Sequence, residues 1–282
     1  MSVFSDLDAS PEPDRPLQYL DETDAFMSAF KAYVVAVMLR YVPGGRVLDV
    51  GCGVGHDLAR LDRAGLTSVG VDMSHLALLR ARSQSPAVVR GDAARLPFRD
   101  GSFAGLRVER VLQHVPDPRL VVDEMLRVVR PGGVLAVLDA DQTSLRVESR
   151  LDPSGALLGG LSISRQPAVA AGVADLLRQR NCRVDDVVTE LSFGYQLDGL
   201  PVDAASRLQR AVRSGALTAD EASAWLAEQT ARTEEGTFRA SWTKILVVAR
   251  TPGATAQMRR LRQPLVESAS RAQCLLALTA QC

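Results

Sequence analysis

Three aspartates end three successive apolar runs of this chain, and a glycine-rich turn follows the first of them. Asp49 stands just before the turn, Asp72 follows residues 67–71, and Asp92 follows residues 86–90. Such runs predict buried parallel strands, whose carboxyl ends meet at one edge of a sheet. A carboxylate there can accept hydrogen bonds from hydroxyl groups or hold a cation. The pattern therefore predicts a binding site for a polar ligand.

The glycine turn distinguishes two classes of ligand. Residues 47–55 read Val-Leu-Asp-Val-Gly-Cys-Gly-Val-Gly. The dinucleotide fingerprint G-x-G-x-x-G would need its third glycine at position 56, which is His56. A carboxylate at Asp49 would also repel a diphosphate by roughly 4 kcal/mol at an effective dielectric near 20, and would attract an ammonium by as much. The turn favours a ligand with an ammonium group and no phosphate.

This stretch resembles motif I of the class I S-adenosylmethionine (SAM)-dependent methyltransferases. Gly-Asp-Ala at 91–93 and Arg-Pro-Gly-Gly at 130–133 follow in the family's order, and residues 109–117 resemble the type 11 branch, which methylates mostly small molecules. The resemblance implies an α/β fold, a doubly wound seven-stranded Rossmann-like sheet whose last strand is antiparallel. It also implies SAM as the cofactor and a methyltransferase activity.

The resemblance assigns a set of cofactor-binding residues, and several of them have a stated role. Asp72 is expected to accept both ribose hydroxyls, Met73 to pack on the adenine or to fill the core, and Asp92 with the Ala93 amide to bind the adenine edge. Cys52 is expected to be a small residue of the turn and not a nucleophile. The full set is Asp49, Gly51, Cys52, Gly53, Asp72, Met73, Asp92, Ala93 and Glu109.

His114 is the candidate general base for an acceptor that is a hydroxyl or a protonated amine. His56 and His75 belong to turns on the cofactor side, whereas His114 follows the fourth predicted strand, where this family brings the acceptor to the methyl group. An unperturbed imidazole titrates near pH 6.5. The alternative is a structural histidine, and Asp139 and Asp141 are the next candidates for the base.

Composition excludes several classes of partner. The 282 residues carry 33 basic and 33 acidic side chains, so no basic field is available to hold nucleic acid or an anionic membrane. The four cysteines form no C-x-x-C pair, and no metal site is expected. No apolar leader or 18-residue apolar run occurs, which predicts a cytoplasmic protein with reduced thiols.

The chain divides into a methyltransferase domain at 44–251 and flanking segments. Residues 1–16 are expected to be flexible, and 17–43 to form a helical lid in which Tyr19 or Phe26 closes over the cofactor, or simply an amphipathic helix on the sheet. Residues 252–282 predict a helical extension that packs on the body or on a second copy, so a homodimer is one expected assembly.

Two insertions, 142–166 and 192–240, are expected to form a cap over the substrate, although the first could also be a disordered surface loop. The fifth strand is predicted at 134–138, just before the first insertion.

The substrate is predicted to be a small apolar, ring-bearing metabolite, of the secondary-metabolite or quinone type. Four aromatic residues in or beside the proposed cap suggest it: Phe193, Tyr195, Trp225 and Phe238. Whether oxygen, nitrogen or carbon is methylated stays open. Two other functions also remain: a nicotinamide-dependent oxidoreductase, and a SAM-binding protein without turnover.

Overall fold

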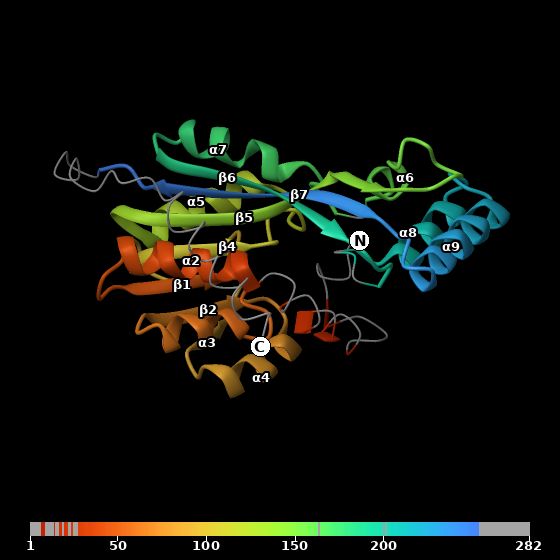
Figure 1. The fold of residues 1–282 in the computed structure, drawn as a ribbon. Coiled ribbons are helices and arrows are strands. Elements are labelled where there is room, and N and C mark those ends of the chain that lie inside the picture. The colour runs from red at the N-terminus through yellow and green to blue at the C-terminus, as the bar shows by residue number, and fades with distance from the viewer. Residues whose placement is uncertain are drawn as a thin grey trace, which may run out of the picture.

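A seven-stranded sheet with helices on both faces forms the body of the protein (Figure 1). The computed structural model describes residues 7–8, 14, 17–18, 20–21, 24, 28–162, 164–198, 200 and 202–253. The strands are β1 Arg46–Val50, β2 Thr67–Asp72, β3 Val88–Arg90, β4 Phe103–Glu109, β5 Val129–Val147, β6 Arg183–Gly194 and β7 Ala240–Arg250. The helices are α2 Ser28–Tyr41, α3 His56–Arg63, α4 His75–Gln84, α5 Pro118–Val128, α6 Leu157–Gly160, α7 Val169–Arg178, α8 Ala204–Arg213 and α9 Ala219–Glu234.

The strand order is β3-β2-β1-β4-β5-β7-β6. Strands β3, β2, β1, β4 and β5 pair in parallel, and β7 runs antiparallel to both of its neighbours, β5 and β6. The predicted fold class is therefore confirmed. Both faces of the sheet are covered, which explains why residues Val47–Val50 are all buried in sequence and show no alternation.

Two apolar layers hold the helices on the sheet. On one face, Val37 and Met38 of α2 pack on side chains such as Val47 and Leu246. On the other face, Met125 of α5 and the apolar side chains of α7 pack against β1, β4 and β5. The two layers fix the strands, and therefore the positions of the loops at their carboxyl ends.

Local capping signals set where several helices begin. The Ser74 hydroxyl accepts a hydrogen bond from the Ala77 N–H at the start of α4, as predicted. The predicted capping box at α9 is also present, with Thr218 and Glu221 bonding each other's backbone N–H groups. These helix starts depend on neighbours in sequence, which is why the sequence reveals them.

Strand β5 is longer than predicted, and the insertion at 142–166 does not begin as irregular chain. After a register shift between Asp141 and Arg146, the strand resumes pairing with β7, and Val147 lies opposite Ala240. Leu145 and Val147 are 1% exposed, which contradicts a disordered surface loop. The polar residues at the shift hide the strand in the sequence, because their side chains bond locally, as Ser144 Oγ does to the Asp141 carbonyl.

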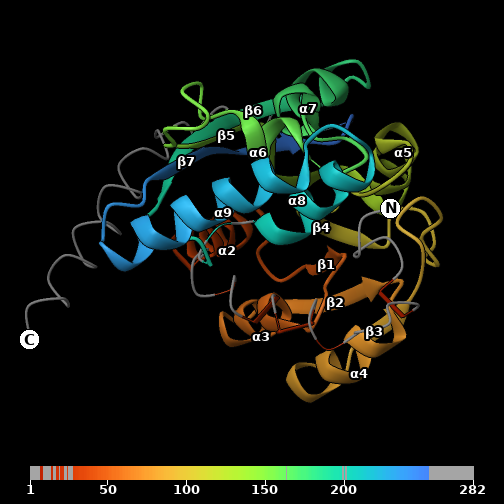
Figure 2. The same cartoon turned by 90° about the vertical axis from the view of Figure 1, so that its right-hand side faces the viewer.

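Helices α8 and α9 form a second layer beyond one end of the sheet (Figures 1 and 2). We call residues 195–239, which join β6 to β7, the cap. It has its own apolar core, in which Trp225 and Phe238 pack with Trp242 of β7 and with Leu145 and Val147 of β5. The prolonged strands therefore serve as the base of the cap.

Several predictions fall outside the described residues: the lid residues Tyr19 and Phe26, and the extension from residue 254 onward. Within the segment predicted to be flexible, Leu7 is 5% exposed and the Asp8 carboxylate accepts hydrogen bonds from Ser74 Oγ and the His75 N–H at 2.6 and 2.8 Å. These two residues therefore lie against the body. No helix among the described residues is long and apolar enough to cross a bilayer.

Candidate functional site

The glycine turn brings bare backbone to the carboxyl end of β1. Gly51, Gly53 and Gly55 all have positive φ, at 70°, 52° and 88°. A Cβ on Gly51 would lie 2.3 Å from a methyl group of Val111, and one on Gly55 would lie 3.0 Å from the Cα of Ala81 in α4. The turn therefore needs glycine both for its conformation and for its packing.

Asp72 fixes the turn from the end of the neighbouring strand. Its carboxylate accepts hydrogen bonds from the Gly53 N–H and the Ser74 N–H, both at 2.9 Å. Burial raises the pKa of Asp72, and these two bonds oppose that effect. Asp72 also lines the cavity described next. One side chain can thus hold the turn and face a ligand.

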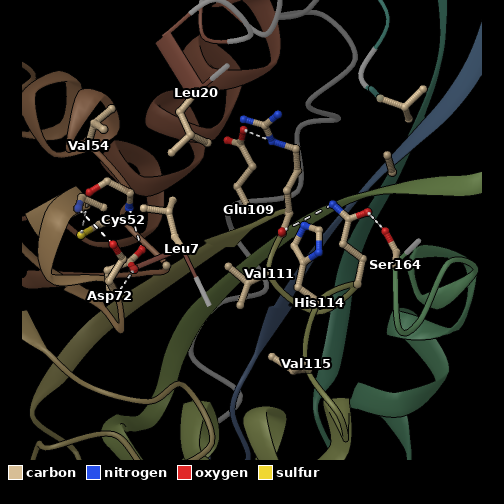
Figure 3. A pocket seen from close by; sticks show the side chains of 18 of the residues that line it. Leu7, Leu20, Cys52, Val54, Asp72, Glu109, Val111, His114, Val115 and Ser164 are labelled. Atoms are coloured by element: carbon tan, nitrogen blue, oxygen red, sulfur yellow. Dashed lines mark hydrogen bonds and ion pairs between the residues drawn. The ribbon is translucent and has the colours of Figure 1, made fainter. Parts of the chain in front are cut away.

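A cavity of about 1060 Å³ runs along this edge of the sheet and continues under the cap. We define its cofactor half by Gly51 to Val54, Asp72, Met73, Asp92 and Ala93. We define its cap half by residues after β4, near the end of β5, before α7 and in the cap: Arg110, Val111, Gln113 to Pro116, Ala140, Gln142, Ser164, Arg165, Leu197, Asp198, Leu200, Val202 to Arg207 and Leu226. In Figure 3, Asp72 and Cys52 lie on one side, His114 and Ser164 on the other, and Glu109 between them.

The structure brings most of the predicted cofactor residues into the cofactor half. Met73 is 50% exposed and lines the cavity, so it does not fill the core. Asp92 faces the same space, and one of its oxygens accepts the Ala94 N–H at 2.9 Å. The Cys52 thiol is buried and burial raises its pKa, so it carries no thiolate at neutral pH.

Asp49 is the exception among the predicted cofactor residues. It is 1% exposed and is not among the residues that line the cavity. Its Oδ1 accepts a hydrogen bond from Arg107 Nη1 at 2.9 Å. The prediction that Asp49 attracts a cationic ligand overlooked Arg107, which already supplies the opposite charge.

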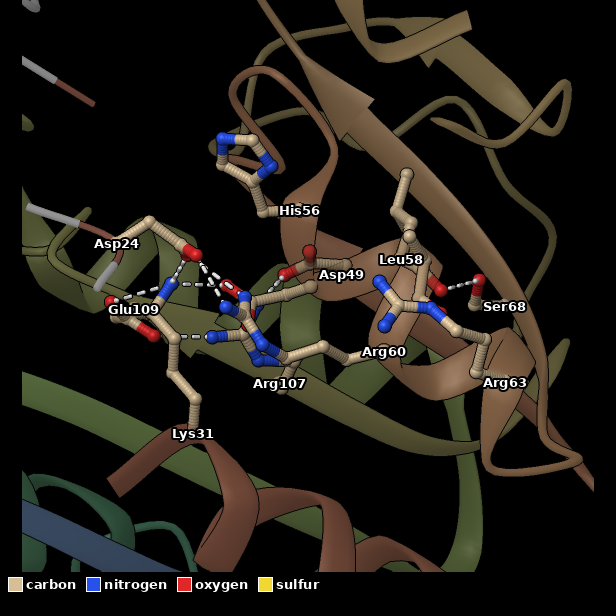
Figure 4. Close-up of polar contacts among 12 residues, drawn as sticks. Asp24, Lys31, Asp49, His56, Leu58, Arg60, Arg63, Ser68, Arg107 and Glu109 are labelled. Atoms are coloured by element: carbon tan, nitrogen blue, oxygen red, sulfur yellow. Dashed lines mark hydrogen bonds and ion pairs between the residues drawn. The ribbon is translucent and has the colours of Figure 1, made fainter. Parts of the chain in front are cut away.

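Arg107 and Lys31 join four carboxylates in one cluster beneath the cofactor half (Figure 4). Arg107 Nη1 lies 3.0 Å from Asp57, and its other nitrogen bonds Glu109. Lys31 Nζ lies 2.6 Å from Asp57 and 3.0 Å from Asp24. Sequence reasoning missed this cluster, although an arginine within the apolar strand at 103–108 was a signal for a buried partner.

Glu109 lines the cavity, as do Asp24 and Asp57 of the cluster, and it lies between the cofactor half and His114 (Figure 3). Its Oε2 accepts a hydrogen bond from Arg107. Its Oε1 is buried and accepts no hydrogen bond from the described residues, although Lys31 and Arg110 lie 3.4 and 3.5 Å away. An anionic oxygen with spare capacity at a cavity wall suits a cationic donor on a ligand.

His114 lines the cap half, and its neighbours weaken it as a base. Burial and the positive charge of Arg110 lower the pKa of His114 to about 4. The imidazole is therefore neutral at neutral pH and has less affinity for a proton than the unperturbed side chain assumed from sequence. The next candidates, Asp139 and Asp141, are not among the residues that line the cavity.

The dependence of folding stability on pH tests the effect of burying the Asp139 carboxyl group. Burial raises the pKa of Asp139 to about 7, above its ordinary value of 3.8, so the folded state binds the proton more tightly and stability falls as pH rises between those values. We expect Asp139→Asn, which cannot ionise, to gain about 2 kcal/mol relative to wild type between pH 5 and pH 7. Urea unfolding across this range measures the difference. Asp141→Asn is the control, and an equal gain there would contradict the assignment.

A chain of amides connects the cap to the segment after β4. Arg207 of α8 donates to Gln142 Oε1, and Gln142 Nε2 donates to Gln113 Oε1 at 2.8 Å. Ser164 Oγ lies 3.4 Å from the same Gln113 oxygen. These contacts set the cap in place over the cavity.

The aromatic residues that suggested a ring-bearing substrate do not line the cavity. Phe193 and Tyr195 are 54% and 60% exposed, while Trp225 and Phe238 are buried in the core of the cap. The apolar lining of the cap half is aliphatic instead and includes Leu200. These four residues therefore do not support the prediction of a ring-bearing substrate.

Comparisons with known proteins find a methyltransferase domain in this chain. A methyltransferase domain model matches residues 48–137. An uncharacterized 37.1 kDa protein of transposon TN4556 from Streptomyces fradiae is 34% identical over 256 residues, which cover 85% of this chain and 72% of that protein.

Two enzymes with stated activities also resemble the chain. A demethylmenaquinone methyltransferase of Renibacterium salmoninarum is 40% identical over 100 residues, which cover 35% of this chain and 42% of that enzyme. The match therefore spans less than half of that enzyme. Phosphoethanolamine N-methyltransferase 2 of Haemonchus contortus, solved in complex with SAM, has a TM-score of 0.51 at 15% identity over 89% of this chain and 60% of that one. At this identity the likeness shows a shared fold.

Proposed function

Because this chain belongs to the class I SAM-dependent methyltransferases, we propose that it moves a methyl group from SAM to a small molecule bound in the cap half. One observation carries the proposal. The glycine turn, Asp72 and Glu109 line the same cavity as the cap half, so a cofactor and an acceptor can meet without leaving it.

The residues of the cofactor half fit SAM. In this proposal Asp72 accepts the ribose hydroxyls, and Asp92 and the Ala93 amide bind the adenine edge, with Met73 on its face. Glu109 binds the ammonium group through the oxygen that lacks a hydrogen bond within the described chain. Gly53 has a φ of 52°, and a Cβ on it would lie 3.3 Å from Cδ1 of Leu20, which lines the same cavity.

SAM supplies an activated methyl group on a sulfonium ion. The protein's own task is to align an acceptor with that group and to keep water out, because in-line displacement needs little else. The cap does this with its aliphatic lining, and its Arg207 donates to Gln142, which in turn donates to Gln113. His114 remains the candidate base for acceptors that carry a proton on the reacting atom.

A hydroxylated ring compound of the quinol type is the substrate class that we favour. The support is the likeness to a demethylmenaquinone methyltransferase, together with an aliphatic cap half that suits an apolar body. The main alternative is a protein that binds SAM without turnover. S-adenosylhomocysteine formed with a panel of quinols would exclude that alternative.

Binding of S-adenosylhomocysteine and of 5′-methylthioadenosine, which lacks the amino-acid end, tests the cofactor half. We expect Glu109→Gln to weaken the preference for S-adenosylhomocysteine by about tenfold and to leave the binding of methylthioadenosine unchanged, because a hydrogen bond to a charged group contributes about 1.5–3 kcal/mol. Isothermal titration calorimetry measures both affinities. Glu234→Gln, on the exposed end of α9, is the matched control.

Two results would contradict the proposal. The first is that the wild-type protein binds neither ligand. The second is that Glu109→Gln reduces both affinities by the same factor. The second result would assign Glu109 to the folding of the cluster and not to the ammonium group.

A further inference from the structure

One wall of the cap half is a chain of hydrogen bonds that begins at a buried guanidinium. Arg207 is 3% exposed and donates to the Leu158 carbonyl at 2.6 Å and to Gln142 Oε1. Gln142 Nε2 donates to Gln113 Oε1 at 2.8 Å, and Ser164 Oγ lies 3.4 Å from the same oxygen. Arg207, Gln142, Gln113 and Ser164 all line the cavity. An acceptor in the cap half therefore lies against this chain.

Arg207 decides which way both amide groups face. The oxygen and the nitrogen of an amide have nearly the same shape, so their positions follow from their partners. A guanidinium can only donate, so Gln142 must turn its oxygen to Arg207 and its nitrogen to Gln113. Gln113 must then present its oxygen to Gln142, because two facing NH₂ groups would both lack an acceptor. The Gln113 nitrogen therefore lies on the side away from Gln142.

Gln113 Nε2 has capacity for a further hydrogen bond. An amide nitrogen carries two N–H groups. Among the described residues, Gln113 Nε2 contacts the Arg110 carbonyl alone, at 3.5 Å, which is long for a hydrogen bond. Gln113 is 3% exposed, and a buried N–H without an acceptor costs about 1–3 kcal/mol. An oxygen atom of a ligand in the cavity would satisfy this nitrogen.

The rest of Gln113 is held in place, so its amide is an ordered donor. Its backbone N–H donates to Asp139 Oδ2 at 3.3 Å, and its backbone carbonyl accepts the Gln166 N–H at 3.0 Å. A donor that is already fixed loses little conformational freedom when a ligand binds. The chain also starts at the positive charge of Arg207, and successive hydrogen bonds in such a chain polarise one another. Both effects strengthen a bond from Gln113 Nε2.

We propose that Gln113 determines acceptor specificity by donating a hydrogen bond from Nε2 to a neutral oxygen of the acceptor, such as a carbonyl. The inference rests on the proposed methyl transfer. Gln142 and Arg207 are positioning residues, because they act through the orientation of the Gln113 amide. An analogue without the oxygen leaves the buried nitrogen unpaired, and sites built around a hydrogen bond discriminate strongly against such analogues.

1-Tetralone and tetralin are suitable probes, because they share one bicyclic skeleton and differ by a carbonyl oxygen. Equilibrium dialysis against protein saturated with S-adenosylhomocysteine measures both affinities. We expect Gln113→Glu to lower the ratio of the tetralone affinity to the tetralin affinity at least fivefold, which matches the loss of one hydrogen bond of about 1 kcal/mol. A carboxylate keeps an oxygen for Gln142 and Ser164 but has no N–H to donate.

Gln142→Glu tests the orientation of the Gln113 amide. The new carboxylate accepts from Arg207 with one oxygen and presents the other to Gln113, whose amide must then turn its nitrogen toward position 142 and its oxygen toward the cavity. We expect the affinity ratio to fall at least fivefold although Gln113 is unchanged. A purely structural role of Gln142 would lower stability without changing the ratio. Gln179→Glu is the matched control, since Gln179 is exposed and does not line the cavity.

The proposal is overturned if the wild type binds neither probe up to the solubility limit, or if Gln113→Glu or Gln142→Glu keeps the affinity ratio of Gln179→Glu. Calorimetry with S-adenosylhomocysteine on the same samples separates the two levels. Normal binding of S-adenosylhomocysteine with an unchanged ratio refutes the role of Gln113 alone. Loss of S-adenosylhomocysteine binding by the wild type refutes the proposed function as well.

Discussion

Replacing Arg107 with methionine is expected to lower the free energy of unfolding by about 3–5 kcal/mol, the usual cost of removing one partner from a buried ion pair. Arg107 is 4% exposed and contacts Asp49, Asp57 and Glu109. Methionine fills a similar volume but leaves these carboxylates facing one another without Arg107, with Lys31 near Asp57 and Glu109, Arg60 near Asp57, and Arg110 near Glu109. Urea unfolding at pH 7 measures the loss.

The loss should shrink as the pH is lowered from 7 to 5. Burial already raises the pKa of Asp49 to about 7, and removing the neighbouring guanidinium raises it further, so the folded variant gains a proton that the unfolded chain does not bind at pH 5. The control is Arg178→Met, whose exposed pair with Asp175 should contribute less than about 1 kcal/mol. Equal losses for the two variants would show that the cluster does not stabilise the fold through Arg107.

Asp72→Ala is expected to weaken the binding of S-adenosylhomocysteine at least tenfold, and about a hundredfold if both proposed ribose hydrogen bonds are lost, since each bond to a charged group contributes about 1.5–3 kcal/mol. The substitution also removes the acceptor for the Gly53 and Ser74 N–H groups, so the turn loses its support at the same time. Isothermal titration calorimetry measures the affinity directly.

Asp62→Ala separates ligand binding from support of the backbone. Asp62 accepts hydrogen bonds from the Ser68 N–H and hydroxyl at the start of β2, and it is not among the residues that line the cavity. Both variants should lose some thermal stability, but only Asp72→Ala should lose affinity. If calorimetry gives Asp72→Ala the affinity of the wild type, Asp72 does not belong to the binding site.

The sequence by itself determined the parts of this protein that depend on neighbouring residues. The glycines predict the turn at 51–55, and Ser74 and Thr218 predict the starts of α4 and α9. Asp72 and Asp92 predict the edge of the sheet. Each of these features depends on the preferences of a few adjacent residues, and a period or a spacing is enough to reveal them. The fold class followed because these local features occur in one order.

Only the tertiary structure decided which distant charges meet. Asp49 and Arg107 are 58 positions apart, yet they are direct partners across β1 and β4, because the strand order places β4 beside β1. That pairing turned an expected ligand contact into a buried ion pair. Whether a buried carboxylate is available to a ligand depends on the charges around it in space, and spacing along the chain carries no information about them.

The positions of the residues that line the cap half also depend on contacts between distant segments. β5 extends to Val147 because β7 lies beside it, and Arg165 faces the cavity because Gln113 holds its neighbours. Hydrogen bonds between segments far apart in sequence fix both positions. No run of adjacent residues encodes them, since each segment alone would satisfy its polar groups with water.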